Sequence, residues 1–304
     1  MKPIFAALTV AFFLLASCSQ RMSDSYVSRY HYLGGVHATN QSSPQFAGRS
    51  EYYLVVLVDA RHLDYTTPSN YFSTLSQGLF LPQDPNTGHT WVVLAGKKEG
   101  KAWVFEGGHT GEFGLYAPRY FDEVVRRAWD ENDPNPASYL FHPLPDGCLQ
   151  YGAGDHHPTF AAAFPLTEEG YLRVHRLLTE DGYDFSHWGL RGPNCIRFSL
   201  ACLASIGIEL NCEEKILLPR SFTYKGEKIT LWSDPAYSCM YVDTPELLEK
   251  KLWELVEKGQ AIAATKWYSS FKRRCEAGEI ILAEAPAHPR GGSAPPTEQI
   301  AQVE

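Results

Sequence analysis

Runs of apolar residues predict four strands before residue 165. Tyr52–Asp59 is a dense run of β-branched and aromatic residues, which is typical of a buried strand. Thr90–Ala95 and Ala102–Phe105 flank a stretch at residues 96–100 that is rich in glycine and lysine, and this arrangement predicts a β-hairpin. Thr159–Phe164 is a fourth apolar run, and it ends at a proline.

Apolar residues at helical spacing predict helices in the second half of the chain. Thr167 is a candidate N-cap and is followed by two glutamates, which the helix dipole favours in a first turn. A second helix is expected to open near Asn194-Cys195 and to end at Gly207, because glycine accommodates the left-handed conformation that follows many helices. Pro245–Lys258 reads as a third, amphipathic helix.

Other segments have weaker local patterns. Residues 222–232 predict a hairpin, and Pro68–Leu75 predicts a short helix with Ser69 as a candidate N-cap. Residues 130–158 are rich in Asp, Pro, Gly and His, so we expect them to be mostly loop.

The N-terminus has the pattern of an export signal. Lys2 supplies a positive charge, and Ile4–Ala16 is an apolar run interrupted only by Thr9. The run is shorter than the roughly 20 apolar residues that a transmembrane helix needs, and it has the length of the apolar region of a secretory signal. It ends in Leu15-Ala16-Ser17-Cys18, which resembles the lipobox of bacterial lipoproteins and implies a lipid on Cys18.

A lipid on Cys18 implies that the protein is anchored to a membrane of the bacterial cell envelope. Ser19 is not the aspartate linked to inner-membrane retention, so the outer membrane is expected in a host with two membranes. The chain is then divided into a signal peptide, a lipidated tether, a folded domain, a C-terminal extension and a disordered tail, at residues 1–17, 18–50, 51–212, 213–283 and 284–304.

Composition and charge narrow the classes of partner. The chain is 44% hydrophobic and 20% charged, which is ordinary for a globular protein. Its formal net charge of −8 argues against nucleic acid as a partner, because binding that polyanion requires clustered Lys and Arg. Lys97, Lys98 and Lys101 are better explained as a hairpin turn.

The seven cysteines are one candidate lipid acceptor and six others. An exported chain meets an oxidising environment in which disulfides are permitted, and the pairing stays open. No Cys-x-x-Cys spacing is present, so a thiolate zinc site or redox pair is not expected, and no cofactor or metal is expected. The six other cysteines are Cys148, Cys195, Cys202, Cys212, Cys239 and Cys275.

Cys195 is the candidate nucleophile. It lies in Gly192–Phe198 at the expected start of a helix, where unpaired amides and the helix dipole lower the pKa of a thiol. A thiol nucleophile needs a base, and His89 stands at the mouth of an expected strand. The alternative is a structural cysteine that is buried or bonded in a disulfide.

The ordered set of these elements resembles the circularly permuted branch of the NlpC-like, papain-like thiol hydrolases, in which the histidine strand precedes the cysteine helix. Lecithin:retinol acyltransferase-like enzymes belong to this branch. Gly114–Pro118 is similar to its Gly-aromatic-Pro element, and Phe164–Glu169 followed by Tyr183 is similar to its run from the last strand to the nucleophile. For residues 51–212 the resemblance implies an α+β fold, a small antiparallel sheet with a packed helix that carries the cysteine.

The resemblance also implies roles for individual residues. Cys195 matches the nucleophile and His89 matches the general base. The third, orienting residue of the family lies on the strand after the histidine strand. Glu106 is our preferred match and His109 is the alternative. The backbone amide of Cys195 is expected to meet the oxyanion.

The remaining candidates carry weaker expectations. Asp155-His156-His157 is expected to be a solvated loop, with a cleft-lining or metal-binding role as the alternative. His187-Trp188 is a candidate wall of the cleft, and Arg197 is expected either to pair with an acid or to lie on the surface.

Together these observations predict an envelope-anchored cysteine hydrolase or acyltransferase. Its substrate would be an amide, ester or thioester, in a peptidoglycan stem peptide or a lipid acyl group. The alternative is a noncatalytic binding lipoprotein on the same scaffold, because fold does not determine function.

Overall fold

The structure is a computed structural model that describes most of the chain between residues 51 and 283. The expected signal peptide, Cys18, the tether, the helix at Pro68–Leu75, Asp155 and the tail lie outside the described residues. The described residues are 51–61, 63, 67, 88–98, 100–111, 116–154, 156–179, 182–224 and 226–283.

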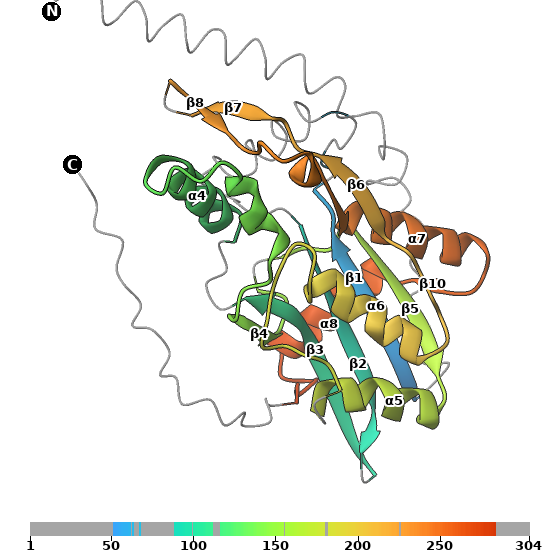
Figure 1. Ribbon diagram of the computed structural model, residues 1–304. Helices are drawn as coiled ribbons and strands as arrows, with labels where there is room; N and C mark the ends of the chain where they lie inside the picture. Colours follow the sequence, from blue (N-terminus) through green and yellow to red (C-terminus); the bar gives the residue numbers. More distant parts are fainter. Residues whose placement is uncertain are drawn as a thin grey trace, which may run out of the picture.

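The chain folds as a mixed α+β structure around a six-stranded sheet (Figure 1). The strand order is β10-β5-β1-β2-β3-β4, and every neighbouring pair is antiparallel. The strands are β1 (Tyr52–Asp59), β2 (His89–Lys98), β3 (Lys101–Gly111), β4 (Gly147–Tyr151), β5 (Phe160–Leu166) and β10 (Ile262–Ala263).

Strand β1 is buried on both faces, which explains why its sequence is continuously apolar rather than alternating. Leu54 and Val56 contribute to one core cluster, and Val55 and Leu57 contribute to the other. Helices α5 (Glu168–Thr179), α6 (Cys195–Ser205) and α7 (Pro245–Glu257) pack on the first face, and α8 (Thr265–Glu276) packs on the second. In Figure 1, α5 and α6 lie in front of the sheet and α8 lies behind it.

The strands, helices and hairpin that the pattern predicts within the described residues are confirmed. Strands β2 and β3 form the expected hairpin, although both extend further than their apolar runs. Thr167 caps α5 by accepting a hydrogen bond from the Gly170 amide at 3.1 Å. Gly207 follows α6 with a positive φ of 85°, as expected for a residue after a helix. Strands β7 (Ser221–Tyr224) and β8 (Glu227–Thr230) form the expected second hairpin.

Residues 130–158 are mostly loop, as expected, but two short elements interrupt the loop. They contain the 3-10 helix η2 (Pro136–Phe141) and strand β4, which pairs with β3 at the edge of the sheet. The local sequence shows no clear strand pattern because the neighbouring strand stabilises β4. Gly147 opens this strand where a Cβ would lie 2.5 Å from the Phe185 carbonyl oxygen, so only glycine fits without a shift.

Residues 213–283 are joined closely to the sheet. This segment supplies β10 at the edge of the sheet, α7 on one face and α8 on the other. It also forms a separate two-stranded ladder, β6 (Glu213–Leu217) with β9 (Cys239–Asp243), and the short 3-10 helix η3 (Pro235–Tyr237). None of the helices within the described ranges is long and apolar enough to cross a membrane.

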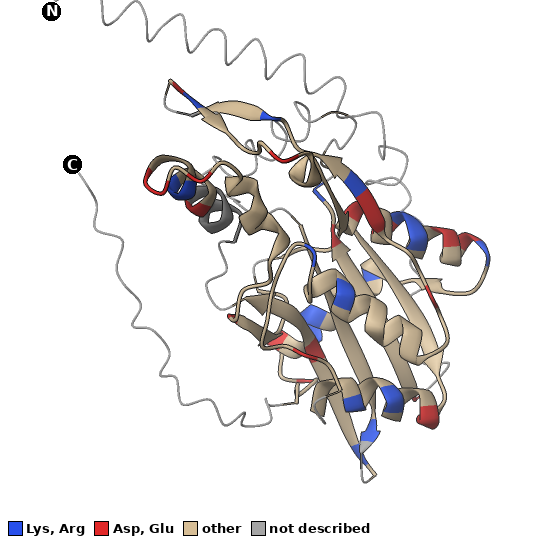
Figure 2. Cartoon of the chain, viewed as in Figure 1, with Lys and Arg blue, Asp and Glu red and all other residues tan. Residues whose placement is uncertain are grey.

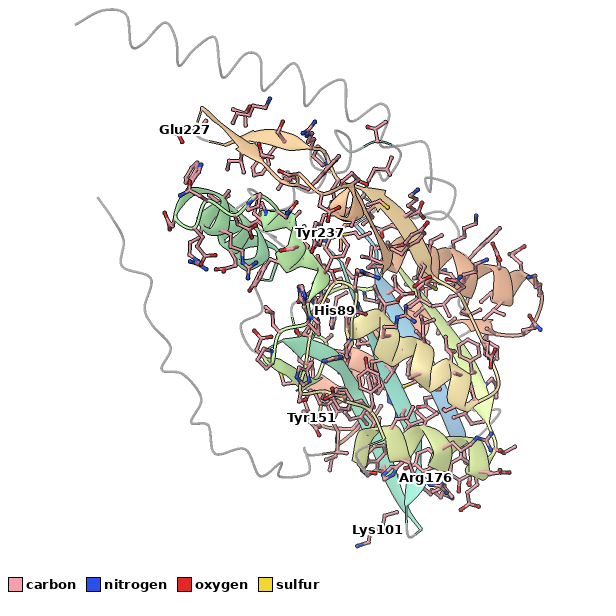
Figure 3. The ribbon with its side chains drawn as sticks, viewed as in Figure 1. His89, Lys101, Tyr151, Arg176, Glu227 and Tyr237 are labelled. Carbon is pink, nitrogen blue, oxygen red and sulfur yellow. The ribbon has the colours of Figure 1, made fainter. Side chains whose placement is uncertain are left out.

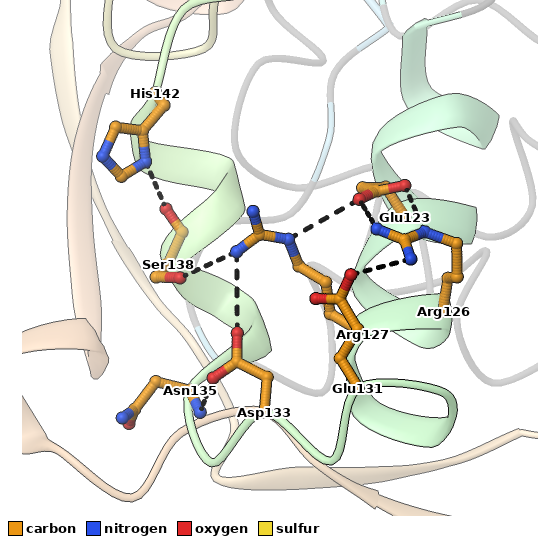
Figure 4. A network of polar contacts seen from close by, with 8 residues as sticks. All are labelled: Glu123, Arg126, Arg127, Glu131, Asp133, Asn135, Ser138 and His142. Carbon is orange, nitrogen blue, oxygen red and sulfur yellow. Dashed lines mark hydrogen bonds and ion pairs between the residues drawn. The ribbon is translucent and has the colours of Figure 1, made fainter.

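Charged residues are concentrated on the peripheral elements, and few lie on the central strands (Figure 2). Helix α4 (Tyr116–Trp129), which sequence reasoning missed, is held to η2 by a polar network (Figure 4). Arg126 pairs with Glu123 at 2.6 Å, and Arg127 contacts Asp133 at 3.5 Å and the Ser138 hydroxyl at 3.5 Å. These groups are partly exposed, so each pair contributes little stability on its own.

We expect the core beneath α6 to dominate stability. Leu203→Ala removes a fully buried side chain from α6 and should lower the free energy of unfolding by about 2–5 kcal/mol. Leu172→Ala makes the same change on α5, where the side chain is 41% exposed, and should cost no more than about 0.5 kcal/mol. Urea unfolding of the two variants measures the difference, and equal costs would contradict this packing.

Candidate functional site

The N-terminus of α6 positions Cys195. Asn194 is the N-cap, and its side-chain oxygen accepts hydrogen bonds from the amides of Ile196 and Arg197, both at 3.0 Å. Its side-chain nitrogen donates to the Gly189 carbonyl at 3.1 Å, which ties the preceding loop to the cap. Cys195 is therefore the first residue of the helix, as the sequence predicted, at its positive end.

The thiol of Cys195 lies between α6 and strand β2. Its side chain is only 7% exposed, and Thr90 of β2 is the neighbouring residue whose backbone and hydroxyl act most strongly to lower the pKa of the thiol. Burial raises the pKa of the thiol above its ordinary value, while the contacts with Thr90 and the amides at the helix start act in the opposite direction. The Thr90 hydroxyl also contacts the Ser199 hydroxyl at 3.0 Å, one turn along α6.

His89 lies on the opposite face of the sheet from Cys195. Successive side chains of a strand point to opposite faces, and Thr90 faces α6, so His89 shares its face with Trp91. The ring of His89 is parallel to that of Trp91, with centroids 6.0 Å apart, and stacks on His156 at 4.5 Å. The side chain of His89 is labelled among the sticks in Figure 3. The structure therefore does not bring the expected base and Cys195 together.

His89 belongs to a buried cluster with Asp59 and His156. Asp59 pairs with His89 across the β1–β2 ladder, and its carboxylate contacts the His156 Nδ1 at 2.9 Å. Burial, followed by the nearby charges of His156 and His109, lowers the pKa of His89 to about 3. His156 lies on a loop, as expected, but its side chain is only 19% exposed, whereas His157 is exposed.

His109 is the histidine that shares a face with Cys195. It lies on β3 two residues after Gly107 and four after Phe105, which belongs to the core cluster beneath α6. Its Nδ1 contacts the Tyr183 hydroxyl at 3.3 Å, and its Nε2 is buried without a hydrogen-bond partner among the described residues. Burial lowers the pKa of His109 to about 4, although the Asn194 carbonyl favours the protonated ring.

Glu106 lies on the other face, against α8. Its two carboxylate oxygens accept hydrogen bonds from the Tyr268 hydroxyl at 2.5 Å and the Lys272 ammonium at 3.1 Å. The carboxylate is fully buried, and this pair of donors offsets the cost of burying its charge. Of the two candidates for the third residue, only His109 is therefore on the same side of the sheet as Cys195.

Tyr183 is also part of the site. In the sequence analysis it belongs only to a segment that resembles the family and has no role. Its hydroxyl donates to the Asn194 carbonyl at 3.2 Å. Burial raises the pKa of this hydroxyl, and the negative charge of a Cys195 thiolate would raise it further. Tyr183 therefore borders both the histidine and the residue before the nucleophile. Trp103 and Val104 are apolar on opposite faces of β3, so the sequence did not show which face meets α6, and the position of Tyr183 on a loop carried no signal either.

The other sequence candidates lie at the margins. Arg197 pairs with Asp243 and with Glu213, the latter at 3.1 Å, which confirms an acidic partner. The side chain of His187 is 46% exposed and contacts Asp184 at 3.1 Å. Trp188 pairs through its backbone with Leu144.

The cysteines and acidic residues are not organised as a disulfide or metal site in the part of the chain that the structure describes. All six cysteines after residue 50 are free thiols. No group of three His, Cys, Asp or Glu side chains within the described ranges could hold a metal ion. Cys195 is therefore a free thiol that shares its face of the sheet with the buried His109.

Comparisons with protein-family models, with curated proteins and with solved structures returned no match. The chemistry of this site therefore has to be inferred from its own geometry.

The two buried histidines predict a loss of stability in acid. Both folded pKa values, about 3 for His89 and about 4 for His109, lie below the value near 6.5 of an unfolded histidine. The unfolded chain therefore binds more protons below pH 6.5, and stability that is present above that pH is lost as the pH falls towards 4 and 3.

Between pH 7.5 and pH 5, we expect each histidine to reduce the free energy of unfolding by about 2 kcal/mol. Urea unfolding at both pH values measures this change. In His89→Gln the reduction should be smaller by about 2 kcal/mol, because glutamine does not titrate. An unchanged reduction in that variant would contradict the buried, neutral state of His89.

A separate prediction concerns Glu106. Glu106→Gln places a donor group against the Lys272 ammonium and should lower the free energy of unfolding by about 1–3 kcal/mol. The rate at which iodoacetamide labels Cys195 should stay within about twofold of that of the unmodified protein. The reason is that Glu106 contacts α8, on the face of the sheet opposite Cys195. Slower labelling of Cys195 without loss of stability would show that Glu106 influences the reactivity of the thiol.

Proposed function

We propose that the protein is a cysteine hydrolase or acyltransferase in which Cys195 is the nucleophile and His109 is the general base. This assigns the base to the residue that was first considered as the third member, in place of His89. The observation that supports the proposal is the buried His109, whose Nε2 has no partner in the described structure, on the same face as a free thiol at a helix N-terminus.

The proposed reaction is acyl transfer through a thioester. The Cys195 sulfur attacks the carbonyl carbon of an amide, ester or thioester, and the thiol proton passes to the Nε2 of His109. The tetrahedral oxyanion is stabilised by backbone amides at the start of α6. His109 then protonates the leaving amine, alcohol or thiol as the C–N, C–O or C–S bond breaks, and water or another acceptor cleaves the thioester and restores the thiol.

The electrostatics of the site support general-base activation rather than a resting ion pair. The pKa of His109 is lowered to about 4 and that of Cys195 is raised, so both groups are neutral at pH 7. A neutral imidazole can accept a proton at the moment of attack. The same arrangement resembles the permuted papain-like order of histidine strand before cysteine helix, which we retain as part of this proposal.

The substrate class follows from the proposed location. A lipid on Cys18 would hold the folded domain at a membrane of the bacterial envelope, at the outer membrane where there are two. Peptidoglycan stem peptides and acyl lipids are the carbonyl compounds available there. We therefore propose one of these two as the substrate.

A noncatalytic binding lipoprotein is the alternative. The observation that favours it is the burial of Cys195, which raises the pKa of the thiol and reduces the thiolate population. The two functions predict different reactivity of Cys195.

The test is alkylation of the full-length chain by iodoacetamide, followed by mass spectrometry of tryptic peptides. Cys195 and Cys202 fall on separate peptides, because Arg197 lies between them, so the fully buried Cys202 on the same helix is an internal control. We expect Cys195 to be labelled at least about tenfold faster than Cys202 and His109→Gln to slow it about tenfold, the usual scale of general-base catalysis or less.

His89→Gln is the matched control, because it makes the same change on the opposite face and should leave the labelling rate unchanged. The same peptide should gain an acyl mass when the protein is incubated with a stem peptide or an acyl ester, and Cys195→Ala should abolish this gain. Labelling of Cys195 as slow as that of Cys202, with no acyl adduct, would favour the binding lipoprotein. Slowing by His89→Gln but not by His109→Gln would overturn the assignment of the base.

A further inference from the structure

The tautomer of a catalytic imidazole decides which nitrogen can accept a proton. A neutral histidine carries one N–H and one lone pair, and the hydrogen bond made by one nitrogen fixes the role of the other. His109 has one partnered nitrogen, Nδ1, and one buried nitrogen without a partner among the described residues, Nε2. The partner of Nδ1 therefore controls whether Nε2 is a base.

That partner is the Tyr183 hydroxyl, which lies between the His109 ring and the Asn194 carbonyl. The hydroxyl donates to the Asn194 carbonyl at 3.2 Å, so its oxygen is left to accept a hydrogen bond. Nδ1 of His109 lies 3.3 Å from that oxygen and can satisfy it only by carrying the N–H. The lone pair is then on Nε2.

We infer that Tyr183 is a positioning residue that holds His109 in the Nδ1–H tautomer and so makes Nε2 the base, an inference that rests on the proposed thiol chemistry. Tyr183 lies twelve residues before the nucleophile in the chain, on the loop that leads into α6. It thereby couples the loop, the strand of the histidine and the cap of the nucleophile helix.

Aromatic packing keeps this hydroxyl in place. The ring of Tyr183 packs against Phe185 with centroids 4.8 Å apart and against Phe198 at 5.3 Å. The imidazole of His109 meets the rings of Tyr183 and Phe185 edge to face, both at 5.4 Å. These contacts hold the two rings in place, so packing keeps the Tyr183 hydroxyl next to the Nδ1 of His109.

Tyr183 also stays neutral throughout. Burial, followed by the charge of a Cys195 thiolate, raises the pKa of its hydroxyl well above the ordinary value. A tyrosine that keeps its proton continues to donate to Asn194 while His109 takes the proton from the thiol. The carbonyls of Asn194, His187 and Phe185 all favour the protonated ring of His109, and so they stabilise the imidazolium that forms.

The experiment compares Tyr183→Phe with Tyr171→Phe in the full-length chain. Both variants remove one hydroxyl from a tyrosine of the same core cluster, but the Tyr171 hydroxyl has no hydrogen-bond partner among the described residues. Long-range ¹H–¹⁵N NMR spectra near pH 7 distinguish a protonated ring nitrogen from one with a lone pair, and His109→Gln assigns the signals of His109. His109 is neutral at this pH, so its tautomer is observable.

We expect protonated Nδ1 and unprotonated Nε2 in the unmodified protein and in Tyr171→Phe. Tyr183→Phe should shift the population towards Nε2–H and should slow the labelling of Cys195 about tenfold, without a matching loss in the urea midpoint. A purely structural role would change the midpoint and leave the tautomer unchanged.

Two results would overturn the inference. One is Nε2–H in the unmodified protein, and the other is an unchanged tautomer in Tyr183→Phe. If Cys195 is reactive and depends on His109 while Tyr183→Phe has no effect, the proposed function survives and the positioning role fails. If the tautomer responds as expected but Cys195 is no faster than Cys202, the proposed thiol chemistry fails, and the role of Tyr183 in it fails too.

Discussion

The alternation of side chains along β2 and β3, in a sheet that is covered on both faces, decides which groups can meet. Thr90 faces α6, so His89 and Trp91 face α8. On β3 the same rule separates Glu106 from His109. Because helices bury both faces, a side chain cannot reach around the sheet. A shift of one residue in register would exchange the two sets of groups between the two faces.

Burial on both faces also sets the charge state of the site. A histidine and a thiol that lose water both favour their neutral forms, which is the opposite of a preformed thiolate–imidazolium pair. The helix dipole, the Asn194 cap and the contacts of Thr90 with the sulfur act against this effect but do not reverse it. Substrate binding would therefore have to supply the remaining driving force, by placing a carbonyl where the negative charge that leaves the thiol is stabilised by the amides of α6. A neutral thiol is also less susceptible to oxidation than a thiolate.

The sequence predicted the elements that are locally determined. β1 is an uninterrupted apolar run, α5 begins at a capping threonine, and α6 begins at Asn194 and is followed by Gly207, so each is recognisable without its neighbours. β4 and α8 are different, because their apolar positions are few and the pairing or packing partner stabilises them. Cys195 at a helix start was predictable on the same local basis.

The choice of base was harder to predict. It depends on which side chains of a strand point towards α6, and that helix lies more than 80 residues further along the chain. The strand that contains His89 was recognised from Thr90 to Ala95, and its apolar residues occupy both faces. Such a strand has no alternation of apolar and polar residues, so its sequence does not show which face its histidine occupies. β3 has a mixed pattern, with exposed and buried positions. Only contacts such as that of Thr90 with Ser199 fix the phase of β2 relative to α6.

The segment after residue 212 has a direct bearing on the site. Tyr268 and Lys272 of α8 neutralise Glu106 on β3, three residues before His109, and Asp243 holds Arg197 on α6, two residues after Cys195. Both ion pairs join this segment to an element that carries a site residue. Glu106 is fully buried, so without α8 its charge would have no partner and β3 would be destabilised where it approaches His109. The geometry of the Cys195–His109 site therefore depends on residues 213–283, and a unit that ended at residue 212 would lack these contacts with β3 and α6.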